Sequence, residues 1–117
     1  MLPPLTPEEL ARAYFGAVAR HDAGALRALF ADDAELVLPS ITIIGAADIA
    51  DFYARAFASG ALSPVPGPMI CEGDRVAVEL ELHAGGVAAP LADFFTARDG
   101  QIARLVVYTG GPPKGSG

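Results

Sequence analysis

Asp93 is the residue whose type and position in this sequence point most directly to chemistry. It stands between the apolar residues Leu91 and Phe95 in a stretch of strand-like composition. In a β-strand these three side chains share one face, which we expect to be the buried, concave one. A buried carboxylate is costly unless it is paired or protonated, and burial raises its pKa. We therefore predict that Asp93 lies in an apolar pocket and can donate a hydrogen bond at neutral pH; on the outer face or in a dimer interface it would pair with Arg98 or Arg104.

The other reactive side chains show no spacing that indicates a metal, nucleotide or nucleophilic site. His21 and His83 are isolated, and Cys71 is the only cysteine, so no metal-ligand pattern is present. Cys71 has no base near it in sequence and is expected to be a small, buried or half-buried side chain. The glycine-rich stretches lack a phosphate-loop pattern. The prediction is therefore no metal and no cofactor.

The composition predicts one folded, acidic domain. The chain has 117 residues, of which 52% are hydrophobic and 19% charged, and this balance argues against disorder. Its net charge of −6 disfavours binding to phosphate backbones and to anionic membranes. We predict a single domain over residues 1–109, a flexible tail over residues 110–117, and no nucleic-acid or membrane partner.

The termini and the cysteine content predict a cytoplasmic protein. Residues 1–6 carry no basic segment followed by a long apolar run, so no signal peptide is expected. No stretch approaches the ~18 uninterrupted apolar residues of a membrane helix. A single cysteine cannot form an internal disulfide.

The first half of the sequence predicts three helices. Thr6-Pro7-Glu8-Glu9 has the pattern of a capping box with proline at the first helical position, and it should start a helix over residues 7–20. Asp22 can cap a second helix, ended by Asp32-Asp33. Gly45 precedes a third, amphipathic helix. Its apolar positions are Ile49, Phe52, Tyr53, Ala56 and Phe57.

The rest of the sequence predicts strands. A short strand over residues 35–38 is stopped by Pro39, and the prolines between residues 64 and 68 predict an irregular connection. Period-two alternation predicts strands over residues 76–83, 89–97 and 102–109, with Pro90 at a bulge or edge position. Helices gathered before strands predict an α+β fold with helices on one face of a curved antiparallel sheet.

Several short motifs carry a family resemblance that extends over about residues 7–109. They are Tyr14-Phe15, Leu29 to Ala34, Gly45 with Ile49 and Phe52-Tyr53, and Asp93-Phe94-Phe95 followed by Asp99 to Ile102. In these motifs the chain resembles the ketosteroid isomerase and SnoaL-like group, whose wider fold is named after nuclear transport factor 2. The resemblance implies a cone-shaped antiparallel sheet wrapped around three helices. It specifies fold better than function, because this fold hosts many activities.

The resemblance to ketosteroid isomerase also implies roles for three positions. That enzyme moves a proton with a carboxylate base and stabilises the dienolate with a tyrosine and a protonated aspartate. Tyr14 matches the tyrosine, although a core residue bonded to a backbone partner is the alternative. Asp93 matches the aspartate, and an alternative alignment places Ala92 there. The base falls on Leu38, which cannot accept a proton.

The leading functional hypothesis is a pocket for a small apolar carbonyl compound, with cofactor-free proton transfer of the isomerase or polyketide-cyclase type. Tyr14 and Asp93 would hydrogen-bond the ligand oxygen. The residues expected around its carbon skeleton are Leu38, Phe52, Tyr53, Phe57, Met69 and Phe95. The missing base leaves a non-catalytic binding or dimerisation module as the alternative. Chemistry like that of limonene epoxide hydrolase is a further alternative, but it needs a second carboxylate that residues 105–108 lack.

The resemblance further implies a homodimer that forms through the outer face of the sheet. Glu79, Glu81 and His83 share one parity on their predicted strand, opposite to its apolar residues. We expect these side chains to be solvated or to lie near that interface, which would make it polar.

Overall fold

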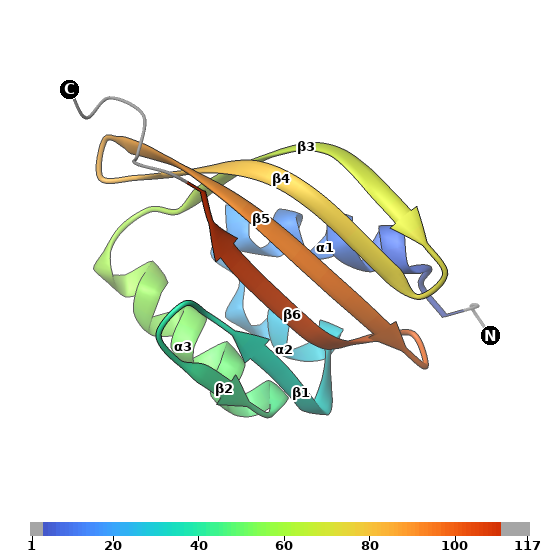
Figure 1. The fold of residues 1–117 in the computed structure, drawn as a ribbon. Coiled ribbons are helices and arrows are strands. Elements are labelled where there is room, and N and C mark those ends of the chain that lie inside the picture. The colour runs from blue at the N-terminus through green and yellow to red at the C-terminus, as the bar shows by residue number, and fades with distance from the viewer. Residues whose placement is uncertain (1–3, 111–117) are drawn as a thin grey trace.

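Three helices and six strands follow one another in the computed structural model, which describes residues 4–110 (Figure 1). The predicted tail, residues 110–117, lies outside this range except for Gly110. The helices are α1 (Pro7–Ala19), α2 (Ala23–Leu29) and α3 (Ala46–Ser59). The strands are β1 (Phe30–Val37), β2 (Thr42–Ile44), β3 (Ser63–Glu72), β4 (Arg75–Ala84), β5 (Val87–Arg98) and β6 (Gln101–Thr109).

The strands form one curved sheet in the order β2-β1-β6-β5-β4-β3, with the helices on one face (Figure 1). The predicted α+β cone fold with three helices is therefore confirmed. The sheet is mixed, however, because β1 pairs with β6 in parallel, with Leu36 opposite Leu105. A parallel pair needs a long crossover connection, and β2 through β5 supply it here.

The predicted helix starts are present in the structure. The Thr6 hydroxyl accepts a hydrogen bond from the Glu9 amide at 3.2 Å, and the Glu9 carboxylate accepts one from the Thr6 amide at 2.8 Å. The Asp22 carboxylate accepts a hydrogen bond from the Ala25 amide at 3.0 Å and caps α2. The second helix ends earlier than expected, because Phe30 already begins β1 and the Asp32-Asp33 pair lies within that strand.

The proline-rich segment predicted to be an irregular connection is instead the edge strand β3. It pairs with β4 alone, and its register shifts between Pro66 and Met69. Proline lacks the amide hydrogen of a ladder, but an edge strand leaves one side unpaired and so tolerates it. The prediction was wrong because the pairing partner, and not the local composition, decides this segment.

Two other details of the sheet depend on neighbouring strands. Pro90 lies in β5, where its carbonyl accepts a hydrogen bond from the Gly110 amide at 2.9 Å. Its missing N–H therefore faces the end of β6, a local edge position. Strand β2 was not predicted; its three residues are too few to show a period.

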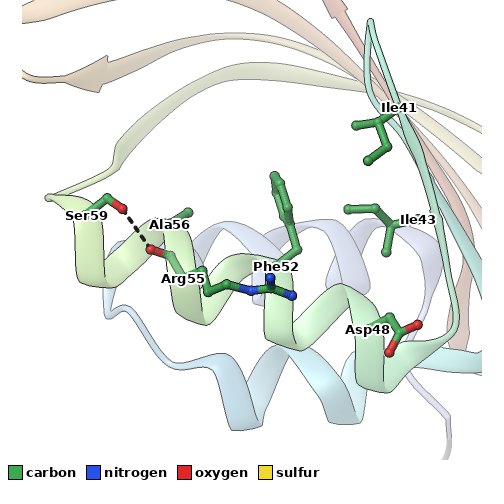
Figure 2. A pocket seen from close by; sticks show the side chains of 7 residues that line it. All are labelled: Ile41, Ile43, Asp48, Phe52, Arg55, Ala56 and Ser59. Carbon is green, nitrogen blue, oxygen red and sulfur yellow. Dashed lines mark hydrogen bonds between the residues drawn. The ribbon is translucent and has the colours of Figure 1, made fainter.

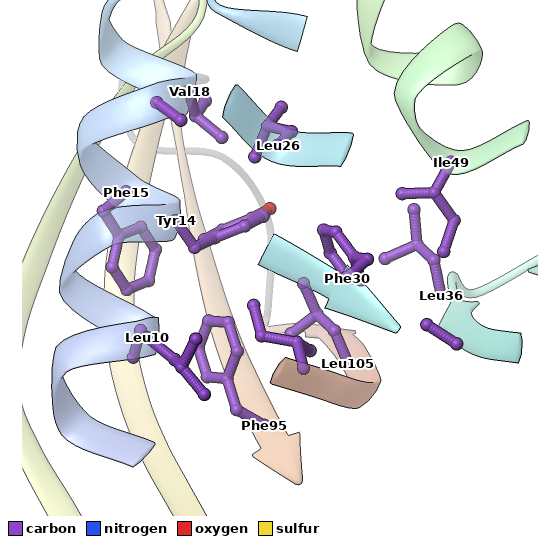
Figure 3. Packing of buried hydrophobic residues seen from close by; sticks show 14 of the residues in the cluster. Leu10, Tyr14, Phe15, Val18, Leu26, Phe30, Leu36, Ile49, Phe95 and Leu105 are labelled. Atoms are coloured by element: carbon purple, nitrogen blue, oxygen red, sulfur yellow. The ribbon is translucent and has the colours of Figure 1, made fainter. Parts of the chain in front are cut away.

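The core lies between the helices and the concave face of the sheet (Figure 3). Its largest fully buried side chains include Leu10, Leu26, Phe30, Leu36, Ile49, Phe95, Ile102 and Leu105. Burial of each such side chain contributes about 1.5–3 kcal/mol. Next to this tightly packed region, other side chains leave space unfilled.

Candidate functional site

A cavity of about 290 Å³ opens between α1, α3 and the concave face of the sheet, next to the packed core. We call it the inner cavity. Helix residues Tyr14, Phe15, Val18, Phe52, Tyr53 and Ala56 line one side, and Leu38, Leu62, Pro64, Leu80, Leu82, Leu91, Asp93 and Val107 line the other. These side chains are almost all apolar, so the cavity favours an apolar occupant.

Asp93 is the one charged residue among the described residues that line the inner cavity. Its side chain is buried at 2% exposure, and its Oδ1 atom has no hydrogen-bond partner. Its neighbours across the two adjacent strands, Val78 and Val107, are apolar. Burial raises the pKa of Asp93 from 3.8 to about 7. The strand parity therefore placed this carboxyl correctly on the concave face.

The outer-face alternative for Asp93 is excluded by where the arginines lie. Arg98 pairs with Asp33, and Arg104 bonds Glu35 at 3.3 Å. Both pairs are exposed and join β1 to the last two strands. Neither arginine is therefore a partner of Asp93.

Two tyrosine hydroxyls meet in the wall of the same cavity. The Tyr14 and Tyr53 hydroxyl oxygens are 2.5 Å apart, and both side chains are buried. Burial raises the pKa of Tyr14 well above its usual value, and the Tyr53 and Asp93 groups raise it further. Burial likewise raises the pKa of Tyr53. Both hydroxyls are therefore protonated at neutral pH, and because one hydrogen is used between them, the other remains available to a ligand.

The polar groups lie in the more deeply buried part of the cavity wall, because Tyr14, Tyr53 and Asp93 are buried whereas Leu38 and Leu62 are half-buried. Phe95, two residues further along β5 than Asp93, does not line the cavity. Its ring packs edge-to-face on Tyr14 with centroids 5.3 Å apart (Figure 3). A ligand that enters the cavity with its polar atom first would meet the tyrosine pair and the acid.

The structure brings together five of the predicted site residues. Tyr14, Asp93, Leu38, Phe52 and Tyr53 all line the inner cavity. Sequence reasoning placed Tyr53 there for its ring and missed that its hydroxyl bonds Tyr14. A buried tyrosine hydroxyl usually has a hydrogen-bond partner, so the sequence could indicate that a partner exists. It could not identify that partner, which lies 39 residues away in sequence.

The other three predicted residues lie outside the cavity lining. Phe57 turns toward the exposed His21 and stacks on its ring with centroids 4.6 Å apart. Met69 packs against the core from the edge strand β3. Phe95 is buried in the core and packs on the Tyr14 ring. Helical or strand spacing marked these side chains as inward-facing but could not say how deep the cavity reaches.

Several lining residues were not predicted. Leu80 and Leu82 belong to the alternating pattern of β4, and that signal was sufficient to place them on the concave face. Leu62 and Pro64 carried no such signal, because their segment does not show the period of a strand.

A second depression lies on the outside of α3 (Figure 2). We call it the outer groove. It measures about 540 Å³ and is lined by Ile41, Ile43, Asp48, Phe52, Arg55, Ala56 and Ser59. Asp48 and Arg55 are exposed, so solvent screens their charges. The outer groove is larger, but the inner cavity encloses Asp93, whose pKa is raised by burial, and is therefore the better candidate site.

The outer face and rim of the sheet hold the remaining reactive residues. Glu79 and His83 are exposed on β4, as expected, and the homodimer stays a prediction. Cys71 is exposed, which corrects the expectation of a buried or half-buried thiol. Its sulfur lies 3.6 Å from a carboxylate oxygen of Glu8, in the first turn of α1.

Two kinds of feature are absent from the described part of the chain. Within residues 4–110, no group of three or more His, Cys, Asp or Glu side chains is placed to hold a metal ion. No helix in that range is long and apolar enough to cross a membrane.

Comparison with known proteins supplies a family and many solved structures with a similar fold. The family model described as a SnoaL-like domain matches residues 11–105. No curated protein matches the sequence. An NTF2-like protein of unknown function from Cytophaga hutchinsonii is 16% identical, with a TM-score of 0.82 over 94% of this chain and 95% of that one.

Two further solved structures carry functional names. A candidate ketosteroid isomerase from Kribbella flavida is 24% identical, with a TM-score of 0.82 over 91% of this chain and 78% of that one. A candidate polyketide cyclase from Sinorhizobium meliloti is 27% identical, with a TM-score of 0.78 over 84% of this chain and 92% of that one.

Proposed function

This chain is a SnoaL-like protein of the NTF2-like superfamily, and from that premise we propose that its inner cavity binds a small apolar carbonyl compound and supports slow, cofactor-free proton transfer. One observation carries the proposal. Asp93 is buried in the wall of an apolar cavity, beside a pair of protonated tyrosines, with an oxygen that has no partner. Hydrogen-bond donors in such a place suit a single ligand oxygen.

The donors would act on the carbonyl oxygen of the ligand. When a proton leaves the carbon next to a carbonyl, negative charge develops on that oxygen. The spare hydrogen of the Tyr14–Tyr53 pair can donate to it, while the ionised form of Asp93 accepts the proton that leaves the carbon. Donors fixed in a water-poor site stabilise such a charge far more than donors in water do. The arrangement therefore favours enolate formation over other reactions of a carbonyl compound.

The cavity is poor in bases, which limits the expected rate. Leu38 lines the cavity where the family resemblance implies the base. Asp93 is the one described lining residue able to take a proton near neutral pH, and its pKa of about 7 suits that role. A positioned base contributes about two to four orders of magnitude to a rate. We expect binding to be strong relative to turnover, and a purely binding protein is the second candidate for the same reason.

Epoxide hydrolysis is less well supported by the same lining. It would need a second carboxylate to help position the attacking water, and Asp93 stands alone among the described lining residues. No part of the proposal relies on this activity.

The size of the cavity narrows the ligand class. An apolar cavity of about 150 Å³ takes up benzene, and the inner cavity is about 290 Å³. Ligands with one or two rings should fit within the walls. A four-ring compound would have to extend out of the opening.

The proposal can be tested with cyclohexyl methyl ketone as the probe. Calorimetry should show tighter binding at pH 5.5 than at pH 8.5, since a neutral Asp93 donates and an ionised one does not. Tyr14→Phe should weaken binding at both pH values, whereas Tyr108→Phe, at an exposed position on β6, should not. Failure of the folded wild-type protein to bind the ketone at either pH would refute the proposal.

A further inference from the structure

We infer that the inner cavity is also a site for a small apolar amine, bound as its ammonium ion against an ionised Asp93. The inference uses the cavity of the proposed function but the other protonation state of its acid. The ketone would be held by the neutral carboxyl, and the amine by the carboxylate. The ketone and the amine therefore require opposite protonation states of Asp93.

The charge inside the cavity is uncompensated. Among the described lining residues there is no lysine, arginine or histidine, and Oδ1 of Asp93 has no hydrogen-bond partner. An ionised carboxylate is costly in such a place unless a cation joins it. Since this chain supplies no cation there, a ligand must bring one. An ammonium N–H directed at Oδ1 would balance the negative charge of the carboxylate and supply the hydrogen bond that Oδ1 lacks.

The walls suit an organic cation better than an inorganic one. Four aromatic rings line the cavity, from Tyr14, Phe15, Phe52 and Tyr53. They form a continuous series, with centroids 5.2 Å apart for Tyr14 and Phe15, 6.0 Å for Tyr14 and Tyr53, and 5.4 Å for Phe52 and Tyr53. Aromatic faces attract ammonium groups within about 6 Å of the ring centre. A metal ion would find one carboxylate and few further oxygen ligands here, whereas the alkyl groups of an amine would bury apolar surface.

Asp93 should control the pH dependence of this binding. The titratable groups facing it are Tyr14 from α1 and Tyr53 from α3, and both stay protonated near neutral pH. The strands beside it offer the apolar residues Leu80 and Val107, and β3 offers Pro64. An alkyl amine, like the lysine side chain, keeps its proton up to about pH 10. Amine binding should therefore strengthen as the pH rises through about 7.

The test uses two probes of nearly equal shape. N,N-dimethylcyclohexylamine and cyclohexyl methyl ketone have the same number of non-hydrogen atoms, but one is cationic and the other neutral. Calorimetry on the wild-type protein should show the amine binding at least about tenfold more tightly at pH 8.5 than at pH 5.5, in line with the ionised fraction of an acid that titrates near 7. The ketone should show the reverse trend.

Two variants distinguish the effect of the Asp93 carboxylate on amine binding from the effect of the protein's overall negative charge. Asp93→Asn keeps the shape of the side chain and should weaken amine binding about tenfold or more at pH 8.5 while removing its pH dependence. Glu79→Gln removes one negative charge from an exposed position on the adjacent strand and should leave amine binding unchanged. Circular dichroism checks the fold of each variant, and the wild-type pH trend stands even if Asp93→Asn does not fold.

Each pattern of results has one meaning. Amine binding that is equal at both pH values, or equal in wild type and in folded Asp93→Asn, overturns the inference. Ketone binding without amine binding overturns it and leaves the proposed function intact. Amine binding without ketone binding supports it and refutes the proposed function, and no binding of either probe by the folded protein overturns both.

Discussion

The inner cavity and the outer groove share Phe52 and Ala56 of α3 as part of their walls, but they differ in how far their charged side chains are exposed to solvent. The outer groove (Figure 2) is nearly twice as large, but its Asp48 and Arg55 side chains are exposed to solvent. In the inner cavity a single carboxyl is enclosed by apolar walls. The comparison teaches that enclosure of a charge, more than volume, marks a site with unusual chemistry.

The difference follows from solvation. Water stabilises an exposed carboxylate and screens its interactions, so its properties stay close to those of a free acid. Removal of that water raises the free energy of the charged form, which is why burial brings the pKa of Asp93 to about 7. The same substitution should therefore have a large effect in the inner cavity and a small one in the outer groove.

The largest effect is expected from a carboxylate placed where the family resemblance implies a base. Leu38→Asp should raise the isomerisation rate of a one-ring β,γ-unsaturated ketone by about 10²- to 10⁴-fold, because a positioned base supplies that factor. The reaction can be followed by the ultraviolet absorbance of the conjugated product. Leu38→Asn controls for shape, and Ile41→Asp places an acid at an exposed position of the outer groove without an expected gain. A folded, ketone-binding Leu38→Asp variant with wild-type turnover would contradict the geometry proposed for the cavity.

A change of stability with pH should be the next largest effect. The folded-state pKa of Asp93 is raised above its unfolded value, so the stabilisation from its protonated form is complete below about pH 4 and is lost as the pH rises through about 7. The loss amounts to roughly 4 kcal/mol for a shift of this size. In urea titrations, the free energy of unfolding of Asp93→Asn relative to wild type should therefore rise between pH 4 and pH 8.

The matching variant in the outer groove is Asp48→Asn. Its free energy of unfolding should differ from wild type by less than about 0.5 kcal/mol, because the side chain is exposed in the folded protein. A flat difference for Asp93→Asn over the same pH range would mean that the buried acid is solvated after all.

An intermediate effect is expected from the tyrosine pair. Tyr53→Phe leaves the buried Tyr14 hydroxyl without its partner at 2.5 Å and should lower the free energy of unfolding by about 1–3 kcal/mol. Tyr108→Phe is the control, since its side chain is 56% exposed and should cost less than about 0.5 kcal/mol. Chemical denaturation measures both values, and equal losses would show that the hydrogen bond contributes nothing of its own.

The smallest effect should come from the charged rim of the outer groove. Arg55 pairs with Asp51 at 3.8 Å, with side chains 80% and 75% exposed. Arg55→Gln should change the free energy of unfolding by less than about 0.5 kcal/mol, because solvent screens such pairs. It should also leave ketone and amine affinities unchanged. A marked loss of affinity in this variant would assign the outer groove a part in binding.

Local signals in the sequence were reliable where one element alone decides the outcome. The capping pattern from Thr6 to Glu9 placed the start of α1, because those groups bond one another within a single turn. Strand alternation placed Asp93 on the concave face, since side-chain direction in a strand depends only on parity. Both predictions needed no knowledge of distant parts of the chain.

Features that need two distant segments were out of reach. The proline-rich strand β3 exists because β4 lies beside it, and its edge position tolerates residues that oppose strand formation elsewhere. The depth of the inner cavity depends on where Phe95 meets Tyr14, across 81 residues of sequence. For that reason Phe57, Met69 and Phe95 could be placed on inward faces but not in or out of the cavity.

The sequence by itself determined an acidic α+β domain with an acid on the apolar side of a sheet, because composition, caps and alternation are local properties. The tertiary structure was needed to show that this acid has an oxygen without a hydrogen-bond partner, that two tyrosine hydroxyls are hydrogen-bonded beside it, and that space remains around all three. The reason is physical: desolvation and cavity volume are sums over every segment that surrounds a point, and no single segment carries that information.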